Sequence, residues 1–312
     1  MTPQHPFRFG VQASTATDAA SWTALARKVE SLGYSTLTMP DHFDDQLAPI
    51  PALMAAAAAT ERLRIGALVW DNDYKHPVVL AKELATLDVL SSGRLEVGLG
   101  AGWLATDYQR SGIPYDSPKV RVDRFEEGLA VIKGALRGEA FSFAGQHYTI
   151  TDFVGSPRPV QAPLPPILIG AGGTRMLSIA AREADIVGIN GTLAAGAVGP
   201  EAIASMTASA VDKKVEIVHA AAGHRVGDIE LNVRAFMVRV TDERRAAMDQ
   251  IAEFVQVDAS LVEESPFALI GTPAQLVDDL LRRRERWGFS YVIVGAADVE
   301  SFAPVVAELA GH

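Results

Sequence analysis

Residues 62–103 restrict the possible folds of this chain more than any other stretch, because the period of their hydrophobic pattern changes twice. Residues 62–70 alternate as a half-buried strand does. Pro77 then occupies a first-turn helix position, and a helical stripe of leucines follows and stops at Gly93. Residues 94–99 alternate again. We therefore expect a βαβ unit in which two parallel strands are neighbours joined by a right-handed crossover.

The same alternation recurs along the chain and predicts the fold class. We expect strands at residues 7–13, 36–39, 62–70, 94–99, 167–169, 185–189, 229–240 and 291–294. Helices are expected between them, at residues 21–32, 50–60, 121–136, 174–183, 201–222 and 272–287 as well as after Pro77. Eight strand–helix units favour a closed (β/α)8 TIM barrel of the α/β class, formed as one domain by residues 1–312, over an open doubly wound sheet.

Three connections are too long to be simple loops. They cover about residues 104–120, 138–166 and 241–267, and the middle one contains FSFAGQHYTI, which predicts a hairpin. Long ordered insertions in barrels usually cover the mouth of the active site or an interface. We therefore expect them at the carboxyl-end face of the barrel, where they help to choose the substrate.

The composition excludes several kinds of partner and site. The net charge is −10, and the densest basic run, residues 282–286, fits the solvated face of a helix, so we expect neither a nucleic-acid nor a membrane partner. There is no cysteine and the seven histidines show no metal-ligand spacing, so we expect no disulfide and no metal. Because the N-terminus has no signal pattern and no apolar run is long enough to span a membrane, a cytoplasmic enzyme is expected.

Strand alternation also predicts which side chains face into the barrel. In the first, third and fourth strands one face is apolar and is expected to meet the helices, so the opposite face points inward. The inward face carries Arg8, Arg64 and Glu96. Buried charges require partners, so we expect these three side chains to form one ionic cluster low in the barrel, as part of the scaffold.

Ligands of parallel α/β proteins bind at the carboxyl ends of the strands, and two of these ends carry suitable groups. Asp41 and His42 follow the second strand. A carboxylate beside an imidazole can hold a polar ring and exchange a proton. The alternative is that Asp41 only caps the following turn and that His42 lies at the surface. The fifth strand ends in Gly170, Ala171, Gly172 and Gly173 before a helix. Their backbone N–H groups suit a phosphate, or they form only a tight turn.

Other strand ends offer flat or polar surfaces. Ala101 and Gly102, after the fourth strand, allow a flat ligand to approach the backbone, or else supply the curvature of the barrel. Trp70 either stacks on a ring or fills the top of the core. We expect the substrate pocket to be lined by Gln12, Ser14, Trp70 and Asn190.

Three segments together resemble a known family. They are Pro40-Asp41-His42-Phe43, the stretch KHPVVLAKELATLDVLSSGRLEVGLGAGW at residues 75–103, and GTPAQLVDDL at residues 271–280. They resemble the luciferase-like monooxygenase superfamily, and within it the branch that uses coenzyme F-420 (8-hydroxy-5-deazaflavin). The resemblance implies a TIM barrel with a flavin or deazaflavin across its mouth, commonly a homodimer, and hydride transfer between C5 of the deazaflavin and an organic substrate.

The resemblance also implies roles for individual residues. Asp41 would contact the deazaflavin ring, and His42 would be the catalytic acid or base that handles the accompanying proton. Counting back from Pro77 places the family's non-prolyl cis peptide, which supports the ring, at Ala67–Leu68. Ala101 and Gly102 match backbone positions along the coenzyme, and residues 170–173 match the loop for its phosphate.

Two positions depart from the pattern of the family. Asp107 stands where some relatives carry an Asn that binds the coenzyme side chain, and we include it in the expected coenzyme site. Leu104 stands near the position of an acidic residue in the sugar-phosphate dehydrogenases of the family, which argues against a sugar phosphate as substrate.

Three functions follow as hypotheses. The first is an F-420-dependent oxidoreductase acting on an unidentified small organic molecule, which the Asp41-His42 pair favours because it is typical of the deazaflavin-using branch. The second is an FMN-dependent monooxygenase of the same superfamily, in which reduced flavin activates oxygen. The third is a barrel that binds a flavin or a metabolite without turnover.

Overall fold

The computed structural model describes residues 5–312, and its centre is a closed barrel of parallel strands. The strands are β1 (Arg8–Gln12), β2 (Thr36–Met39), β3 (Arg64–Ala67), β4 (Trp70–Asp71), β5 (Leu95–Gly100), β8 (Ile167–Ala171), β9 (Ile186–Ile189), β10 (Glu230–Arg234) and β13 (Phe289–Gly295). Their order is β3-β2-β1-β13-β10-β9-β8-β5-β4, and a further pairing of β3 with β5 closes the ring. Because β3 and β4 share one strand position, the barrel has eight, and the predicted (β/α)8 TIM barrel is confirmed.

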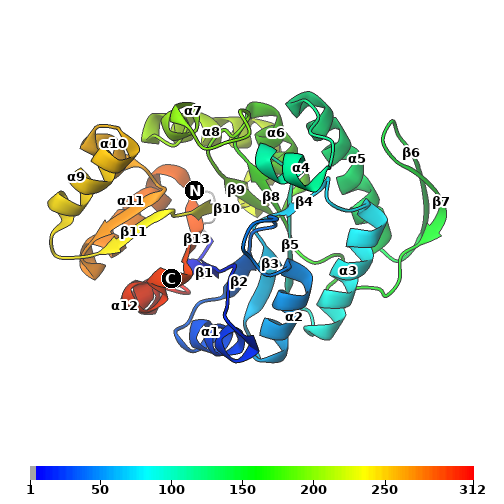
Figure 1. Ribbon diagram of the computed structural model, residues 1–312, viewed down its shortest axis with the longest axis horizontal. Coiled ribbons are helices and arrows are strands. Elements are labelled where there is room, and N and C mark those ends of the chain that lie inside the picture. Colours follow the sequence, from blue (N-terminus) through cyan, green and yellow to red (C-terminus); the bar gives the residue numbers. More distant parts are fainter. Residues whose placement is uncertain (1–4) are drawn as a thin grey trace.

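Helices surround the barrel (Figure 1). They are α1 (Ala19–Ser31), α2 (Pro49–Ala58), α3 (Pro77–Leu90), α5 (Pro118–Leu136), α6 (Thr174–Glu183), α8 (Ala208–Ala222), α11 (Pro273–Trp287) and α12 (Val299–Leu309). Local signals set their starts: Asp18 and Thr272 form capping boxes with the residues three positions on, and α2, α3, α5 and α11 begin with proline. The helices cover the outward strand faces, where Phe9, Val11 and Ile65 are fully buried.

Three predicted elements are each divided in the structure. The strand predicted at residues 62–70 is split into β3 and β4, and the one predicted at residues 229–240 into β10 and β11 (Met237–Val240). The helix predicted at residues 201–222 is α7 (Pro200–Ala204) followed by α8. Hydrophobic periodicity continues through each break, which is why the sequence predicted unbroken elements. Two short 3-10 helices, Gly223–Asp228 and Ala296–Asp298, complete the chain.

The three insertions have different structures. The first contains α4 (Ala105–Ser111). The second contains the predicted hairpin, β6 (Ala140–Ala144) with β7 (Thr149–Val154), which projects outside α5 (Figure 1). In the third, α9 (Arg244–Val255) and α10 (Ala259–Glu264) pack on a separate two-stranded parallel sheet of β11 and β12 (Ala268–Gly271). The sequence did not predict β12.

The predicted ionic cluster is present at the barrel floor. Oε1 of Glu96 accepts hydrogen bonds from Nη1 of Arg8 (2.6 Å) and Nε of Arg64 (2.8 Å). Burial would raise the pKa of Glu96, but the charges of Arg8 and Arg64 outweigh burial and hold this pKa below its ordinary value. The prediction missed Glu230 of β10, which accepts a 2.6 Å hydrogen bond from Nη2 of Arg8, and Tyr291, whose ring lies 3.5 Å from the Arg8 guanidinium carbon.

None of the helices within residues 5–312 combines the length and the hydropathy needed to cross a membrane.

Candidate functional site

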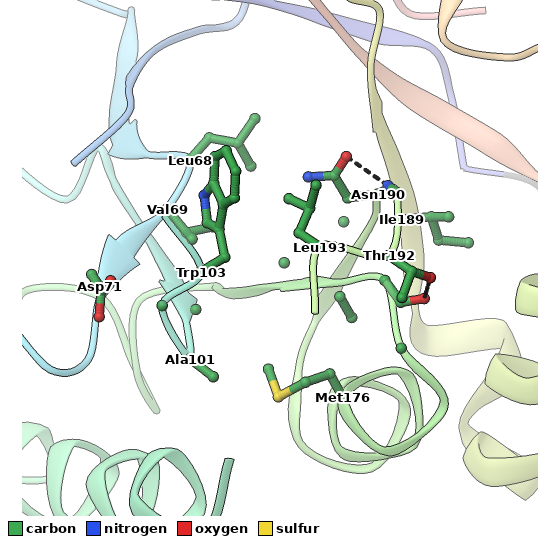
Figure 2. A pocket seen from close by; sticks show the side chains of 18 of the residues that line it. Leu68, Val69, Asp71, Ala101, Trp103, Met176, Ile189, Asn190, Thr192 and Leu193 are labelled. Carbon is green, nitrogen blue, oxygen red and sulfur yellow. Dashed lines mark hydrogen bonds between the residues drawn. The ribbon is translucent and has the colours of Figure 1, made fainter. Parts of the chain in front are cut away.

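A cavity of about 630 Å³ opens at the carboxyl ends of the barrel strands (Figure 2). It collects most of the residues that the sequence predicted to form a site: Gln12, Asp41, His42, Leu68, Ala101, Gly102, Gly170, Ala171, Gly172, Gly173 and Asn190. In Figure 2, Leu68, Val69 and Trp103 form one wall, Asn190, Thr192 and Leu193 stand opposite, and Met176 lies below. The lining residues come from seven of the eight strand positions of the barrel, all except β13, and from the segments that follow them, so the folded barrel is what assembles this site.

Four predicted site residues do not line the cavity. Trp70 is 1% exposed and packs in the main hydrophobic core, and Ala67 is buried at the end of β3. Ser14 lies in the loop after β1, where its carbonyl oxygen accepts a hydrogen bond from the Leu47 N–H. Asp107 is buried in α4 and reaches the site only through another side chain. Ser14 and Trp70 were expected in the substrate pocket, but neither lines this cavity: Trp70 faces the core and Ser14 is held in its loop.

The non-prolyl cis peptide is at Leu68–Val69 and not at the predicted Ala67–Leu68. The regular ladder of β3 with β2 continues as far as the pairing of Ala67 with Met39, so the irregular segment begins one residue later than counting from Pro77 indicated. The Leu68 carbonyl accepts a 3.1 Å hydrogen bond from Nε2 of Gln12. Both residues of the bond line the cavity and give it an apolar wall (Figure 2).

His42 is paired with Asp107 at the cavity. Its Nδ1 lies 2.7 Å from Oδ2 of Asp107, and the same oxygen accepts a 3.1 Å hydrogen bond from the Tyr74 hydroxyl. The Trp103 ring packs edge-on against the imidazole, with centroids 5.8 Å apart. A carboxylate at Nδ1 fixes the tautomer with the proton on Nδ1 and leaves Nε2 to exchange a proton. No hydrogen bond within the described part of the chain engages Nε2.

Two carboxyl groups beside this pair are difficult to ionise. Burial raises the pKa of Asp41, whose Oδ2 accepts a hydrogen bond from the Asp71 N–H. Burial, followed by the nearby charges of Asp73 and Asp41, raises the pKa of Asp71 to about 7. The Tyr108 hydroxyl donates to the Asp71 carboxylate at 3.0 Å. Burial on this side of the cavity therefore favours the protonated form of both carboxyl groups relative to water.

The glycine loop after β8 has the open geometry that a phosphate requires. Gly173 is the N-cap of α6 and makes no side-chain cap, and a Cβ built on it would meet no atom within 4 Å. Arg121 and Arg175 also line this cavity: Nε of Arg121 is buried without a partner in residues 5–312, while Arg175 is paired with Asp123 and Glu126. Backbone N–H groups at a helix start, supported by guanidinium groups, suit an anionic group.

A buried lysine holds the loop that follows β9, which also lines the cavity. Lys214 of α8 donates from Nζ to the Asn190 carbonyl at 2.5 Å, and burial lowers the pKa of this lysine to about 8. Lys214 also lines a second hollow, shared with Gly172, Gly173 and Thr192, which adjoins the first.

Several lining residues were not foreseen from the sequence. They are Trp103, Arg121, Arg175, Arg234, Phe236 and the segment at residues 191–194 with Val198 and Met206. Arg175 follows the glycine loop directly, and Arg234 shares the inward face of β10 with Glu230, so both had a signal in the sequence. Of the three insertions, only the end of the first reaches the cavity, through Pro118, while residues 138–166 and 241–267 contribute no lining residue.

Comparison with known proteins identifies the family to which the chain belongs. The model for luciferase-like monooxygenases matches residues 4–291, and the chain belongs to this family. It is 28% identical over 210 residues to the FMNH2-dependent dimethylsulfone monooxygenase of Pseudomonas putida, a match covering 67% of this chain and 54% of that protein. It is 30% identical over 258 residues to the F-420-dependent glucose-6-phosphate dehydrogenase of Nakamurella multipartita, covering 80% of this chain and 72% of that enzyme.

A solved structure shares the fold over almost the whole length. The coenzyme F-420-dependent tetrahydromethanopterin reductase of Methanopyrus kandleri superposes with a TM-score of 0.78 at 18% identity, covering 98% of this chain and 99% of that one. Among the sequence relatives, the chain spans about half the length of several that it matches. Both F-420-dependent and FMN-dependent enzymes are therefore among its relatives.

Proposed function

We propose that this protein is an oxidoreductase that uses coenzyme F-420 and acts on a small organic molecule. The observation that carries the proposal is the His42–Asp107 pair, whose Nδ1 and Oδ2 atoms are 2.7 Å apart at the cavity. The same cavity has an apolar wall that suits a flat ring and a glycine loop that suits a phosphate. When bound, the deazaflavin supplies or accepts a hydride at C5. A hydride transfer to a carbonyl or from an alcohol also needs a proton to move, and His42 is a group at the cavity able to move it.

The residues present fit a coenzyme of this kind. Leu68 and Val69 provide an apolar wall for one face of a ring, and Ala101 and Gly102 also line the cavity. Gly102 is required there, because a Cβ at this position would lie 1.8 Å from the Tyr108 hydroxyl oxygen. The glycine loop, Arg121 and Arg175 would hold the phosphate.

The pairing of His42 gives Asp107 a different role from the one that the resemblance implied. Its carboxylate lies 2.7 Å from the imidazole, so Asp107 orients His42 and stabilises the ring when it carries a second proton. Asp107 is thus a positioning residue, and the coenzyme side chain would be held by other groups. Asp41, with its raised pKa, would present a carboxyl group to the polar edge of the ring.

An FMN-dependent monooxygenase is the second candidate function. The 28% identical monooxygenase of Pseudomonas putida, matched over 67% of this chain, favours it. The apolar wall and the glycine loop would accept FMN as well, since both coenzymes carry a tricyclic ring and a phosphate. The two functions differ in their need for oxygen, which a hydride transfer does not use. As the family resemblance implies, we also propose that the chain works as a homodimer.

Direct titration of the purified protein with oxidised F-420 and with FMN, followed by coenzyme fluorescence, tests this proposal. We expect a dissociation constant for F-420 at least tenfold lower than that for FMN. Arg121→Gln should weaken the binding of either coenzyme, while the exposed Arg158→Gln should not. Tight FMN binding with negligible F-420 binding, or turnover that stops when oxygen is removed, would establish the monooxygenase instead.

A further inference from the structure

Arg234 is an arginine at the cavity whose guanidinium is only partly used by the protein. It ends β10, where its Nε donates to Oε1 of Gln12 at 2.9 Å and its Nη1 donates to the Ala235 carbonyl. Its Nη2 makes no hydrogen bond within residues 5–312 and is not enclosed by protein atoms. Nη2 lies beside Gly295, where a Cβ would be 3.2 Å from it, and Arg234 lines the cavity, so we take this edge of the guanidinium as the one open to a ligand.

Arg121 and Arg283 are also buried without an ion pair in residues 5–312, but two other partly buried arginines are each neutralised by two carboxylates. Arg8 is paired with Glu96 and Glu230, and Arg124 is paired with Asp73 and Asp116. No carboxylate within residues 5–312 comes within 4.0 Å of the Arg234 guanidinium. Burial lowers the pKa of Arg234 to about 10, and Asp298 opposes this shift only from a distance. A partly buried cation without a partner is costly, so a bound anion would stabilise it.

The position of Arg234 relates it to the reacting part of the proposed coenzyme. Gln12 accepts from Arg234 and donates from Nε2 to the Leu68 carbonyl, in the wall against which the ring is proposed to lie. Phe236, half exposed at the cavity, has its ring centroid 5.4 Å from the Arg234 guanidinium carbon. A free cationic edge beside an aromatic face suits an organic anion that has an apolar part.

We propose that Arg234 binds a carboxylate group of the substrate, so that the substrate of the proposed oxidoreductase is an organic monoanion. This inference rests on the proposed function, because it treats this end of the cavity as the substrate side. A carboxylate matches one free guanidinium edge. A phosphate dianion fits poorly, since the guanidinium offers one free edge and the charge of Asp298 acts on it as well.

Pairs of small molecules that differ only in charge test this assignment. Dissociation constants for benzoate and benzamide, and for hexanoate and hexanamide, are measured by calorimetry on the protein with and without coenzyme. We expect at least one carboxylate to bind tenfold or more tightly than its amide. Arg234→Gln should bring the two constants of that pair to within about threefold, and Arg234→Lys should retain part of the preference, since it keeps the charge and loses the planar fork.

Arg239→Gln is the matched control, because Arg239 also lies near Asp298 but is exposed on β11 and does not line the cavity. It should keep the full carboxylate preference. The proposal is overturned if no carboxylate is preferred over its amide, if Arg234→Gln retains the preference, or if Arg234→Gln weakens F-420 binding by the same factor, which would make Arg234 a coenzyme contact. Failure of F-420 to bind while the carboxylate preference persists would overturn the proposed function and leave the anion site.

Discussion

At the scale of single residues, the pairing of a side chain determines what it can do. His42 would be an ordinary imidazole at the end of a loop without Asp107, which lies 65 residues further along the chain. The carboxylate at Nδ1 selects one tautomer, so the nitrogen that can exchange a proton is Nε2. The same rule applies at the barrel floor, where the buried Glu96 can carry a negative charge because the guanidinium groups of Arg8 and Arg64 both donate hydrogen bonds to it.

Replacing Asp107 by Ala is expected to remove the preference of His42 for one tautomer. Nitrogen-15 NMR of the imidazole should show the proton of the neutral ring on Nδ1 in the wild-type protein, because Asp107 accepts it there. In Asp107→Ala this preference should disappear, and any turnover should fall about 100-fold because the base is no longer held in place. Asp249→Asn, which removes an exposed carboxylate far from the cavity lining, is the control. A wild-type ring protonated on Nε2 would contradict the assignment.

Replacing Glu96 by Gln is expected to destabilise the fold strongly. The variant leaves Arg8 and Arg64 close together at the barrel floor with one carboxylate fewer, and breaking a buried ion pair costs about 3 kcal/mol. Urea denaturation should show that loss in the free energy of unfolding. Glu300→Gln, at an exposed pair with Lys28, should leave this free energy unchanged. Equal midpoints for the two variants would show that the floor cluster is not required for stability.

The floor cluster was predictable at this scale because strand alternation has a strict period of two. Arg8, Arg64 and Glu96 follow from that period alone. Glu230 was missed because the prediction treated residues 229–240 as a single strand without asking which of its faces points inward. The partner of His42 could not be predicted, because the orientation of α4 over the barrel brings Asp107 to the ring and no local pattern encodes it.

At the scale of elements, the segments after the strands define the site more than the strands do. The turn after β5 passes so close to Asp71 and Tyr108 that Gly102 can carry no side chain, and its φ is 74°. This turn, the cis peptide and the glycine loop are the three backbone surfaces that enclose the cavity. Asp71, the last residue of β4, adds its carboxyl group to the cavity lining.

Gly102→Ala and Gly112→Ala form a matched pair for the role of the turn after β5. Both glycines have a positive φ, 74° and 76°, but a Cβ at Gly112 meets no atom within 4 Å. Gly112→Ala should lose only about 1 kcal/mol of stability through backbone strain. Gly102→Ala should lose clearly more and should weaken F-420 binding at least tenfold, as read by thermal unfolding and by titration. Unchanged coenzyme binding in Gly102→Ala would remove this turn from the site.

Asp71→Asn is expected to change how stability depends on pH. The pKa of Asp71 is about 7 in the folded protein, because burial raises it, and near 4 in the unfolded chain, so the folded state retains a proton between these values. The free energy of unfolding should therefore fall as the pH rises from about 4 to about 7, by up to about 4 kcal/mol from this group. Asp71→Asn should remove that part of the decline, measured by denaturation at several pH values.

The exposed Asp45→Asn variant controls for the loss of one carboxylate from the surface. If the difference in stability between the wild-type protein and Asp71→Asn is the same at pH 4 and pH 8, folding does not raise the pKa of Asp71, which contradicts the effect of burial described here.

Sequence patterns located the elements well and the contents of the insertions poorly. Strand and helix periods are local, so β2 and α6 have the bounds that were expected. The breaks after Ala67, Ala204 and Arg234 depend on tertiary contacts, and no change of period marks them. For the same reason, the long insertions were expected at the mouth, while the hairpin packs along α5, where Glu127 accepts hydrogen bonds from its turn.

At the scale of the whole molecule, the barrel determines where a ligand binds, and the loops determine which ligand the site can accept. Eight parallel strands direct their carboxyl ends to one face, and the groups found there agree with a coenzyme that combines a flat ring and a phosphate. Membership of the luciferase-like family agrees with this arrangement. The family includes users of both coenzymes, so the choice between them rests on the residues that face the ring.

A crystal structure of the protein soaked with oxidised F-420 tests the central claim most directly. We predict density for one coenzyme in the 630 Å³ cavity, with its ring against Leu68 and Val69 and its phosphate at Gly172 and Gly173. His42 should lie on the open side of the ring and keep its contact with Asp107. Coenzyme bound outside this cavity, or a ring placed away from the Leu68–Val69 wall, would contradict the account.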